Sequence, residues 1–261
     1  MRLRCVRLTA LMVLGIGSWE LRARALPPVD SNLPLSKGTH WVYRGTLRGH
    51  ESQATCESPP VTRDVAWRME VVDTLVRGGV SAAVIAGYLV DLMNADVVKG
   101  RIDIPRTESL LIRQQDEKYY LLEDRDMRTA LSRLKDPTDS LEGLIKNRGP
   151  HFDLPLSRGK VFGDPEQMAM SRKDIESGHT QWIGDLYVVE NVSDVSLTGI
   201  EGIAAATRVQ RYQLRYLTNT SLRTMGFVHG IGITDFSFDY HPAGCLMLET
   251  KVKLTSFHRG S

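Results

Sequence analysis

Four side chains that can bind a metal or move a proton lie within thirteen residues near the C-terminus: His229, Asp235, Asp239 and His241. Imidazole nitrogens and carboxylate oxygens ligate divalent metals and form acid–base pairs, so this polar cluster could support metal-assisted hydrolysis. On a strand, Asp235 and Asp239 project to one face, and the two histidines share that face only if no bulge intervenes. Gly230 and Gly232 favour a bulge, which leaves the register of the cluster open.

The alternative for this cluster is a solvated strand face, with Phe236, Phe238 and Tyr240 on the opposite face against the core. Gly230-Ile231-Gly232 does not make a dinucleotide-binding fingerprint, because it lacks the third glycine and precedes a strand-like run rather than a helix. We expect this glycine pair to form a tight turn or a bulge.

The rest of the sequence carries no catalytic signature: it lacks a nucleophile elbow, a zinc-protease motif, a Walker loop and a kinase signature. Glu123-Asp124-Arg125-Asp126 lacks the alternating oxygens and the glycine of a calcium loop, and is typical of the first turn of a helix. His40, His151 and His179 are isolated in the sequence, and we expect each of them in a turn or at the surface. The sequence therefore predicts no catalytic residues, no metal site and no cofactor.

The first 25 residues have the layout of a bacterial secretory signal peptide. Arg2, Arg4 and Arg7 precede a short apolar run from Leu8 to Ile16, and Ala23-Arg24-Ala25 resembles a cleavage site. The apolar run is shorter than the roughly 20 residues of a membrane-spanning helix, and no stretch after Ile16 is long and apolar enough to span a membrane. An amphipathic helix of the folded protein is the alternative. The signal-peptide pattern predicts an exported protein, periplasmic or extracellular, without a transmembrane segment.

Export also changes the charge of the folded protein. Residues 1–25 carry five arginines and one glutamate, so their removal takes the net charge from +2 to about −2. No block of like charge remains, which argues against a nucleic-acid partner and an anionic lipid surface. Residues 26–261 are enough for a single β-rich domain with a sizeable core.

Cys56 and Cys245 are the cysteines that remain after cleavage. An exported chain meets an oxidising compartment, so we predict a disulfide between them. Cys56 precedes Pro59-Pro60 and Cys245 follows Pro242-Ala243-Gly244, both at the expected ends of strands. The alternative is two unpaired cysteines, which a Cα–Cα separation above about 7 Å would favour.

A six-residue phrase occurs twice. Leu33-Pro34-Leu35-Ser36-Lys37-Gly38 returns 121 residues later as Leu154-Pro155-Leu156-Ser157-Arg158-Gly159. Proline followed by a glycine that can take positive φ predicts a turn that leads into a strand. The spacing suggests half-repeats at 33–123 and 152–257, joined by a helical connector at 124–150. One continuous sheet in which both phrases share a turn is the alternative.

Alternating apolar residues predict a mainly β fold: an antiparallel, curved sheet or a partly open barrel. Trp41 and Tyr43 should face the core, with Val42 and Arg44 on the opposite face. Helical spacing is confined to Arg125–Lys135 and Asp139–Lys146. We expect the remaining periodic segments to be strands: Val65–Leu75, Val80–Leu92, Ser109–Arg113, Lys118–Leu122, Gln181–Val192, Ala204–Thr218, Ser221–Val228 and Leu246–Phe257.

Three motifs carry a family resemblance: the first Leu-Pro-Leu phrase with Trp41 and Tyr43, its second copy, and the closing run Gly230-Ile231-Gly232-Ile233. With these motifs the chain resembles a group of uncharacterised secreted bacterial proteins, over nearly all of its length after the signal peptide. The resemblance implies a β-rich extracytoplasmic fold and no assigned activity. Pro242-Ala243 stands where the group would carry a second histidine, which argues against a paired-histidine site.

Two classes of function remain. In the first, the protein is a non-catalytic binding or structural module of the cell envelope, whose curved sheet holds an apolar small molecule, a lipid or a partner protein. In the second, it is a metal-assisted hydrolase that uses the cluster from His229 to His241. We favour the binding module, and expect the hydrolase only if these side chains converge in one cleft. The sequence does not indicate an oligomeric state.

Overall fold

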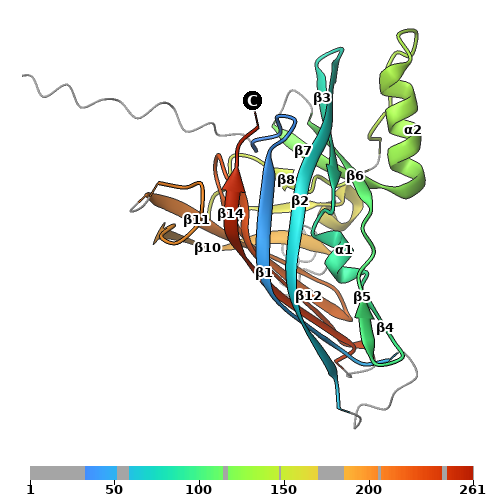
Figure 1. Cartoon of the computed structure of the whole chain (residues 1–261). Helices are drawn as coiled ribbons and strands as arrows, with labels where there is room; N and C mark the ends of the chain where they lie inside the picture. The colour runs from blue at the N-terminus through green and yellow to red at the C-terminus, as the bar shows by residue number, and fades with distance from the viewer. Residues whose placement is uncertain are drawn as a thin grey trace, which may run out of the picture.

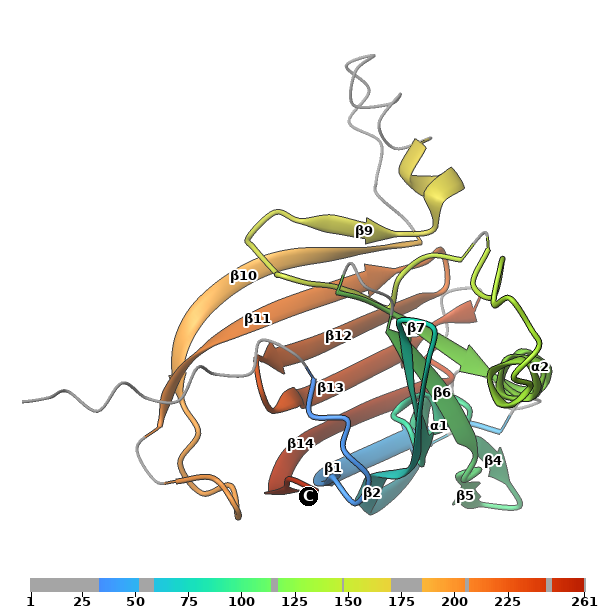
Figure 2. The ribbon, with the colours of Figure 1, turned by 90° about the horizontal axis from the view of Figure 1, so that it is seen from above.

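The computed structural model describes residues 33–51, 59–113, 117–146, 148–169, 185–204, 207–242 and 246–260. The chain is mostly β, as predicted: a twelve-stranded antiparallel sheet curls until it is nearly closed into a barrel, beside a small second sheet (Figures 1 and 2). The elements of the first half are β1 (His40–Gly49), β2 (Val61–Arg77), β3 (Val80–Ala86), α1 (Val90–Met93), β4 (Asp96–Val98), β5 (Arg101–Asp103), β6 (Glu108–Arg113), β7 (Lys118–Glu123) and α2 (Asp124–Lys135). Those of the second half are β8 (Phe152–Asp153), β9 (Val161–Gly163), β10 (Leu186–Ser196), β11 (Arg208–Leu217), β12 (Ser221–Val228), β13 (Gly232–Tyr240) and β14 (Leu248–His258).

The strand order of the large sheet follows the chain around the barrel. It runs β8-β7-β6-β3-β2-β1-β14-β13-β12-β11-β10-β9, with β4 and β5 forming the second sheet. β14, the last strand, pairs along its length with β1, from His40 opposite His258 to Gly49 opposite Leu248. The two strands at the sheet edges, β8 and β9, are the ones that follow each other in the middle of the chain. We call residues 148–163, which contain both edge strands, the seam.

The repeated Leu-Pro-Leu phrase forms the same turn in both copies. Gly38 and Gly159 have φ of +84° and +81°, a conformation that glycine adopts without a steric cost. In each copy the backbone N–H after this glycine donates to the serine carbonyl at 3.0 Å, and the turn exchanges two hydrogen bonds with the neighbouring strand, at Val71 and Val189. The strands that follow differ, with ten residues in β1 and three in β9. The division into half-repeats at 33–123 and 152–257 stays a prediction.

The barrel interior is filled by apolar side chains, and β1 contributes two of the largest. Trp41 and Tyr43 are 1% and 0% exposed, while Arg44 on the other face is exposed, which confirms the predicted alternation. The Trp41 indole donates to the carbonyl of Ile231 at 2.6 Å, and the Tyr43 hydroxyl donates to that of Ile233 at 2.9 Å. The first motif and the closing motif are therefore bonded to each other across the interior.

A smaller core lies between the outer face of the sheet and α2. Met127, Ala130 and Leu134 of α2 pack against buried residues of β3, β6 and β7, so this helix lies over the sheet. The predicted second helix, Asp139–Lys146, is wrong in type: residues 142–146 form turns instead. Gly143 and Leu141 have positive φ there, +66° and +59°, which a regular helix does not accommodate.

Where the structure describes them, the other predicted strands are found, except for the end of Val80–Leu92; residues 181–184 and 205–206 of two of them lie outside the described ranges. β3 stops at Ala86, Gly87 takes a φ of +69°, and α1 follows. An apolar run does not distinguish a buried strand from a buried helical turn, so periodicity alone could not place this break. Within the described ranges, no helix has the length and apolarity needed to cross a bilayer. The predicted signal peptide, 1–25, lies outside the described residues.

Candidate functional site

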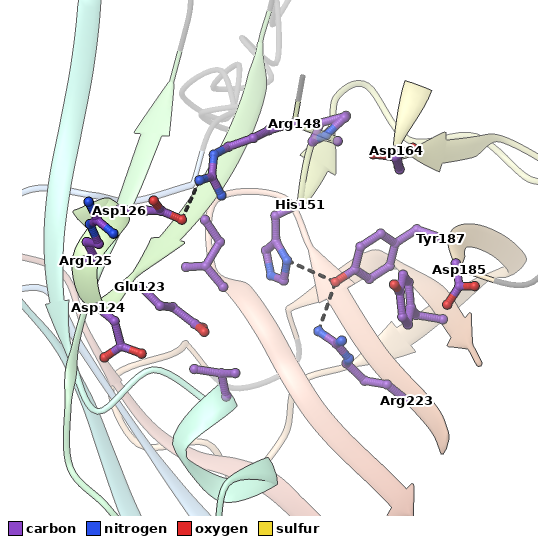
Figure 3. A pocket seen from close by; sticks show the side chains of 16 residues that line it. Glu123, Asp124, Arg125, Asp126, Arg148, His151, Asp164, Asp185, Tyr187 and Arg223 are labelled. Carbon is purple, nitrogen blue, oxygen red and sulfur yellow. Dashed lines mark hydrogen bonds and ion pairs between the residues drawn. The ribbon is translucent and has the colours of Figure 1, made fainter. Parts of the chain in front are cut away.

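The seam forms one wall of a pocket of about 570 Å³ at an end of the barrel interior (Figure 3). The alternation of inward-facing and outward-facing residues along β7 and β12 brings two charged side chains into this pocket. Glu123 continues the inner face of β7 after Tyr119 and Leu121, and Arg223 begins the inner face of β12 before Met225 and Phe227. The interior is therefore apolar at its centre and charged at this mouth.

The imidazole of His151 is held between two tyrosines. The Tyr88 hydroxyl lies 2.7 Å from its Nε2 and the Tyr187 hydroxyl 3.0 Å from its Nδ1. The backbone N–H of His151 donates to the Tyr119 carbonyl at 2.7 Å, which fixes the seam to β7. Arg223 Nη1 donates to the Tyr187 hydroxyl at 3.0 Å, so Tyr88, His151, Tyr187 and Arg223 form one hydrogen-bonded chain. Figure 3 shows the part of it from His151 to Arg223.

Burial sets the protonation states of the side chains in this hydrogen-bonded network. It lowers the pKa of His151 to about 3, with a second contribution from the Arg223 guanidinium. Burial also raises the pKa values of Tyr88 and Tyr187. At neutral pH the imidazole is uncharged, with one N–H donor and one acceptor nitrogen. One tyrosine therefore donates to the ring and the other accepts from it.

The guanidinium of Arg223 stacks on two aromatic rings. Its Cζ lies 4.8 Å from the centroid of the Tyr216 ring and 5.7 Å from that of Tyr187. These contacts hold a charge in place by cation–π attraction. Among the described residues, Arg223 Nε has no hydrogen-bond partner although it is buried. A buried donor without a partner is uncommon in a folded protein, and a ligand or ordered water is the usual explanation.

Glu123 supplies an opposite charge to the same pocket. It is the N-cap residue of α2, yet its side chain makes no capping hydrogen bond. Burial raises the pKa of its carboxyl group, as does the neighbouring Asp124 carboxylate to a smaller extent. In the described part of the chain this half-buried carboxylate has no ion-pair partner, so it is available to a ligand.

The lining as a whole carries more negative than positive charge. Its five carboxylates are Glu123, Asp124, Asp126, Asp164 and Asp185. Its three guanidinium groups are those of Arg125, Arg148 and Arg223. Arg148 pairs with Asp126, and Asp164 accepts two backbone hydrogen bonds from the helical turn at 165–169. Glu123, Asp124 and Asp185 therefore face the pocket against Arg223 and Arg125.

The seam is held shut by close backbone packing and by one lysine. A Cβ at Gly149 would overlap with the backbone of Gly163, so the two seam segments cross without side chains between them. Lys160 Nζ lies 2.8 Å from Asp153 Oδ1 and also donates to the Asp153 carbonyl at 2.6 Å. These contacts join the two edges of the sheet where few ladder hydrogen bonds exist.

The structure does not gather the predicted polar cluster into one site. Asp235 forms a bidentate pair with Arg211 on the outer face, and His229 packs edge-on against the rings of Tyr212 and Phe227. Asp239 lies beside Glu249, and burial together with this neighbour raises its pKa. His241 is exposed just after β13. The described residues contain no group of three or more His, Cys, Asp or Glu side chains suited to a metal.

The turn at Gly230 and the buried phenylalanines of β13 were predicted correctly, whereas Tyr240 and His151 differ from the prediction. Gly230, with a φ of +74°, forms the expected tight turn, and a register shift interrupts the β12–β13 pairing beside Phe227. Phe236 and Phe238 are buried as expected, whereas Tyr240 is 38% exposed because it ends the strand. His151, expected in a turn or at the surface, lies at a bend before β8 but is not at the surface, since it is 6% exposed. Cys56 and Cys245 both lie outside the described residues, so their disulfide stays a prediction.

The functional candidates that the sequence did not reveal are His151, Tyr187, Arg223 and Glu123. Each is far from the others in the chain, and no motif unites them. One signal was present: Glu123 and Arg223 occupy inward positions of strands that are otherwise apolar on that face. A charge at such a position requires either a partner or access to solvent.

No protein-family model matches the chain, and no curated protein matches it either. Two solved structures are similar to it. One, described as a "putative exported protein with YmcC-like fold" from Bacteroides fragilis NCTC 9343, is 9% identical with a TM-score of 0.37, over 88% of this chain and 99% of that one. The other, a "putative lipoprotein" from Parabacteroides distasonis ATCC 8503, is 9% identical with a TM-score of 0.33, over 87% and 97%. At these scores neither similarity bears on the function of this chain.

Proposed function

We propose that this is an exported binding protein of the bacterial cell envelope, and that the seam pocket is its binding site. Export rests on the signal-peptide pattern of residues 1–25. The observation that carries the binding role is Arg223, a guanidinium fixed on the pocket lining by two rings and a tyrosine, whose Nη2 makes no hydrogen bond with the described residues. A volume of about 570 Å³ lies within the range of small-molecule sites.

The pocket suits a polar ligand better than an apolar one. Core residues such as Trp41, Met69 and Phe152 enclose a cavity of only about 10 Å³, far below the few hundred Å³ that a small molecule occupies. An apolar molecule or lipid chain inside the barrel would have to displace this packing. The seam pocket is open and charged, and it accepts a polar ligand without such a change.

The chemistry of the pocket favours binding over catalysis. A general base works best with a pKa near the working pH, whereas the pKa of His151 is about 3 and both of its ring nitrogens are engaged. The hydrolase based on His229 and His241 stays a prediction, and no geometry of the described residues favours it.

The test is to fill the pocket and ask whether ligand binding is lost. Val90 lines the pocket from α1, so Val90→Trp should occupy its volume. The matched control is Val98→Trp, at an exposed position of β4. Native mass spectrometry of each protein, purified from the envelope, would show any small molecule that co-purifies.

We expect a bound molecule in the wild type and in Val98→Trp, and none in Val90→Trp. Thermal unfolding of all three proteins would establish that Val90→Trp is folded. Equal ligand occupancy in the two variants would contradict the assignment of the site, and an empty wild type that no small polar molecule stabilises would contradict the binding function.

A further inference from the structure

Glu123 and Arg223 carry opposite charges on the lining of the seam pocket, and they are not paired with each other. In Figure 3, Glu123 and Asp124 lie on the side of β7 and α2, and Arg223 lies beyond His151 on β12. No ion pair joins Glu123 to Arg223 in the described part of the chain. Opposite charges within one pocket that do not touch each other can each pair with a different end of a ligand.

The Arg223 side is built for a carboxylate. A guanidinium presents its N–H donors as a planar fork that matches the two oxygens of a carboxylate. One of these donor groups, Nη1, is committed to Tyr187, and Nε is buried away from the pocket. Nη2 makes no hydrogen bond with the described residues, so its N–H donors remain for a ligand. Stacking on Tyr216 and Tyr187 fixes the plane of the fork before a ligand arrives, which lowers the entropic cost of binding.

The Glu123 side is built for a cation. Within the described residues Glu123 makes neither a capping hydrogen bond nor an ion pair, and Asp124 lies next to it. With Asp185 also on the lining, the carboxylates without an ion pair outnumber Arg223 and Arg125. A ligand with only negative charge would be repelled by this excess, whereas a ligand that also carries an ammonium group would be attracted.

We propose that the ligand is a short peptide with free ends, whose C-terminal carboxylate pairs with Arg223 and whose N-terminal ammonium pairs with Glu123. This inference rests on the proposed function of the seam pocket and specifies its ligand. A zwitterionic ligand can pair with Arg223 and with Glu123 at the same time. A pocket of about 570 Å³ has room for more than a single amino acid, so the two charged ends are separated by a short backbone.

The test uses three tripeptide mixtures of randomised sequence: one with free ends, one N-acetylated and one C-amidated. Binding to the full mature chain is measured by native mass spectrometry and by competition in calorimetry. Each capping reaction removes one charge and should weaken binding about tenfold or more, as expected for the loss of one charge-assisted hydrogen bond.

Two variants then show which side chain binds which end of the peptide. Glu123→Gln should bind the free and N-acetylated mixtures equally, and Arg223→Met should bind the free and C-amidated mixtures equally. Glu108→Gln on β6 and Arg208→Met on β11 are matched exposed controls outside the pocket, and they should keep the wild-type preferences. If Arg223→Met does not fold, Glu123→Gln with the N-acetylated mixture still tests the ammonium end.

The proposal is overturned if capped and free mixtures bind alike, or if the variants do not change the preference for free ends. If no peptide binds while another molecule co-purifies with the wild type and is lost in Val90→Trp, the peptide assignment fails and the binding function stands. If neither peptides nor any other molecule binds, both fail.

Discussion

Acidification should destabilise this protein through His151, starting near pH 6.5. The folded-state pKa of this imidazole is about 3, against an ordinary value of 6.5. Between these two values the unfolded chain binds a proton that the folded chain does not, so the free energy of unfolding falls as the pH falls. The stabilising contribution is therefore complete above about pH 6.5 and is lost progressively toward pH 3.

The expected magnitude follows from the burial of the ring. One pKa unit corresponds to about 1.4 kcal/mol, so a decrease from pH 6.5 to pH 4 should cost about 3 kcal/mol through this residue alone. His151 is 6% exposed and lies between two tyrosines whose pKa values are raised, beside a guanidinium that stays charged. None of these neighbours offers an acceptor charge that would stabilise an imidazolium.

The assay is urea unfolding at half-unit steps from pH 4 to pH 7.5, on the wild type and on His151→Gln. Glutamine can donate and accept as the neutral imidazole does but does not titrate, so the difference between the two slopes isolates His151 from the carboxylates that both proteins share. His258→Gln, at an exposed position beside the His40 ring, is the control and should keep the wild-type slope. Equal slopes in the wild type and His151→Gln, or an NMR titration of His151 with a pKa above about 5, would refute this reasoning.

Three further predictions concern the core and the export of the chain. Trp41→Ala should lower the free energy of unfolding by about 3–5 kcal/mol, because it empties a core position and unpairs the Ile231 carbonyl; a loss below about 1 kcal/mol in urea denaturation would contradict this. Thiol titration of the unfolded, unreduced mature protein should find no free thiol if Cys56 and Cys245 are bridged, and two per chain if they are not. N-terminal sequencing of protein from the envelope fraction should begin at Leu26, and an uncleaved chain found only in the cytoplasm would count against export.

Local periodicity was sufficient to predict most of the strands and their inward faces. Trp41 and Tyr43 alternate with Val42 and Arg44, which lie on the opposite face, and Gly78 and Gly79, both with positive φ, join β2 to β3. These features depend on residues within a few positions of one another, which is the range over which a pleated strand imposes its pattern. The break after Ala86 was missed because the apolar residues that follow it fit a buried strand and a buried helical turn equally well.

The site depends on contacts that local periodicity does not encode. His151 meets Tyr88 and Tyr187, which are 63 and 36 residues away along the chain, and only the closing of the sheet brings them together. The polar cluster from His229 to His241 was the stronger candidate in sequence because its members are close in the chain. The turn at Gly230 and the register shift beside Phe227 then separate them in space.

The pairing of β1 with β14 has a consequence for how the chain reaches its native state. The two strands lie side by side in the middle of the sheet, and the Gly260 N–H even donates to Thr39 Oγ1, 221 residues away. The entropic cost of closing a loop grows with its length, and folds rich in such long-range contacts fold slowly. Until β14 has been synthesised, both β1 and β13 have an unpaired edge, so the barrel cannot close on a nascent chain. A polypeptide that stays open until its last strand is available remains competent for translocation in the unfolded state, and truncation at its C-terminus removes a central strand rather than an edge.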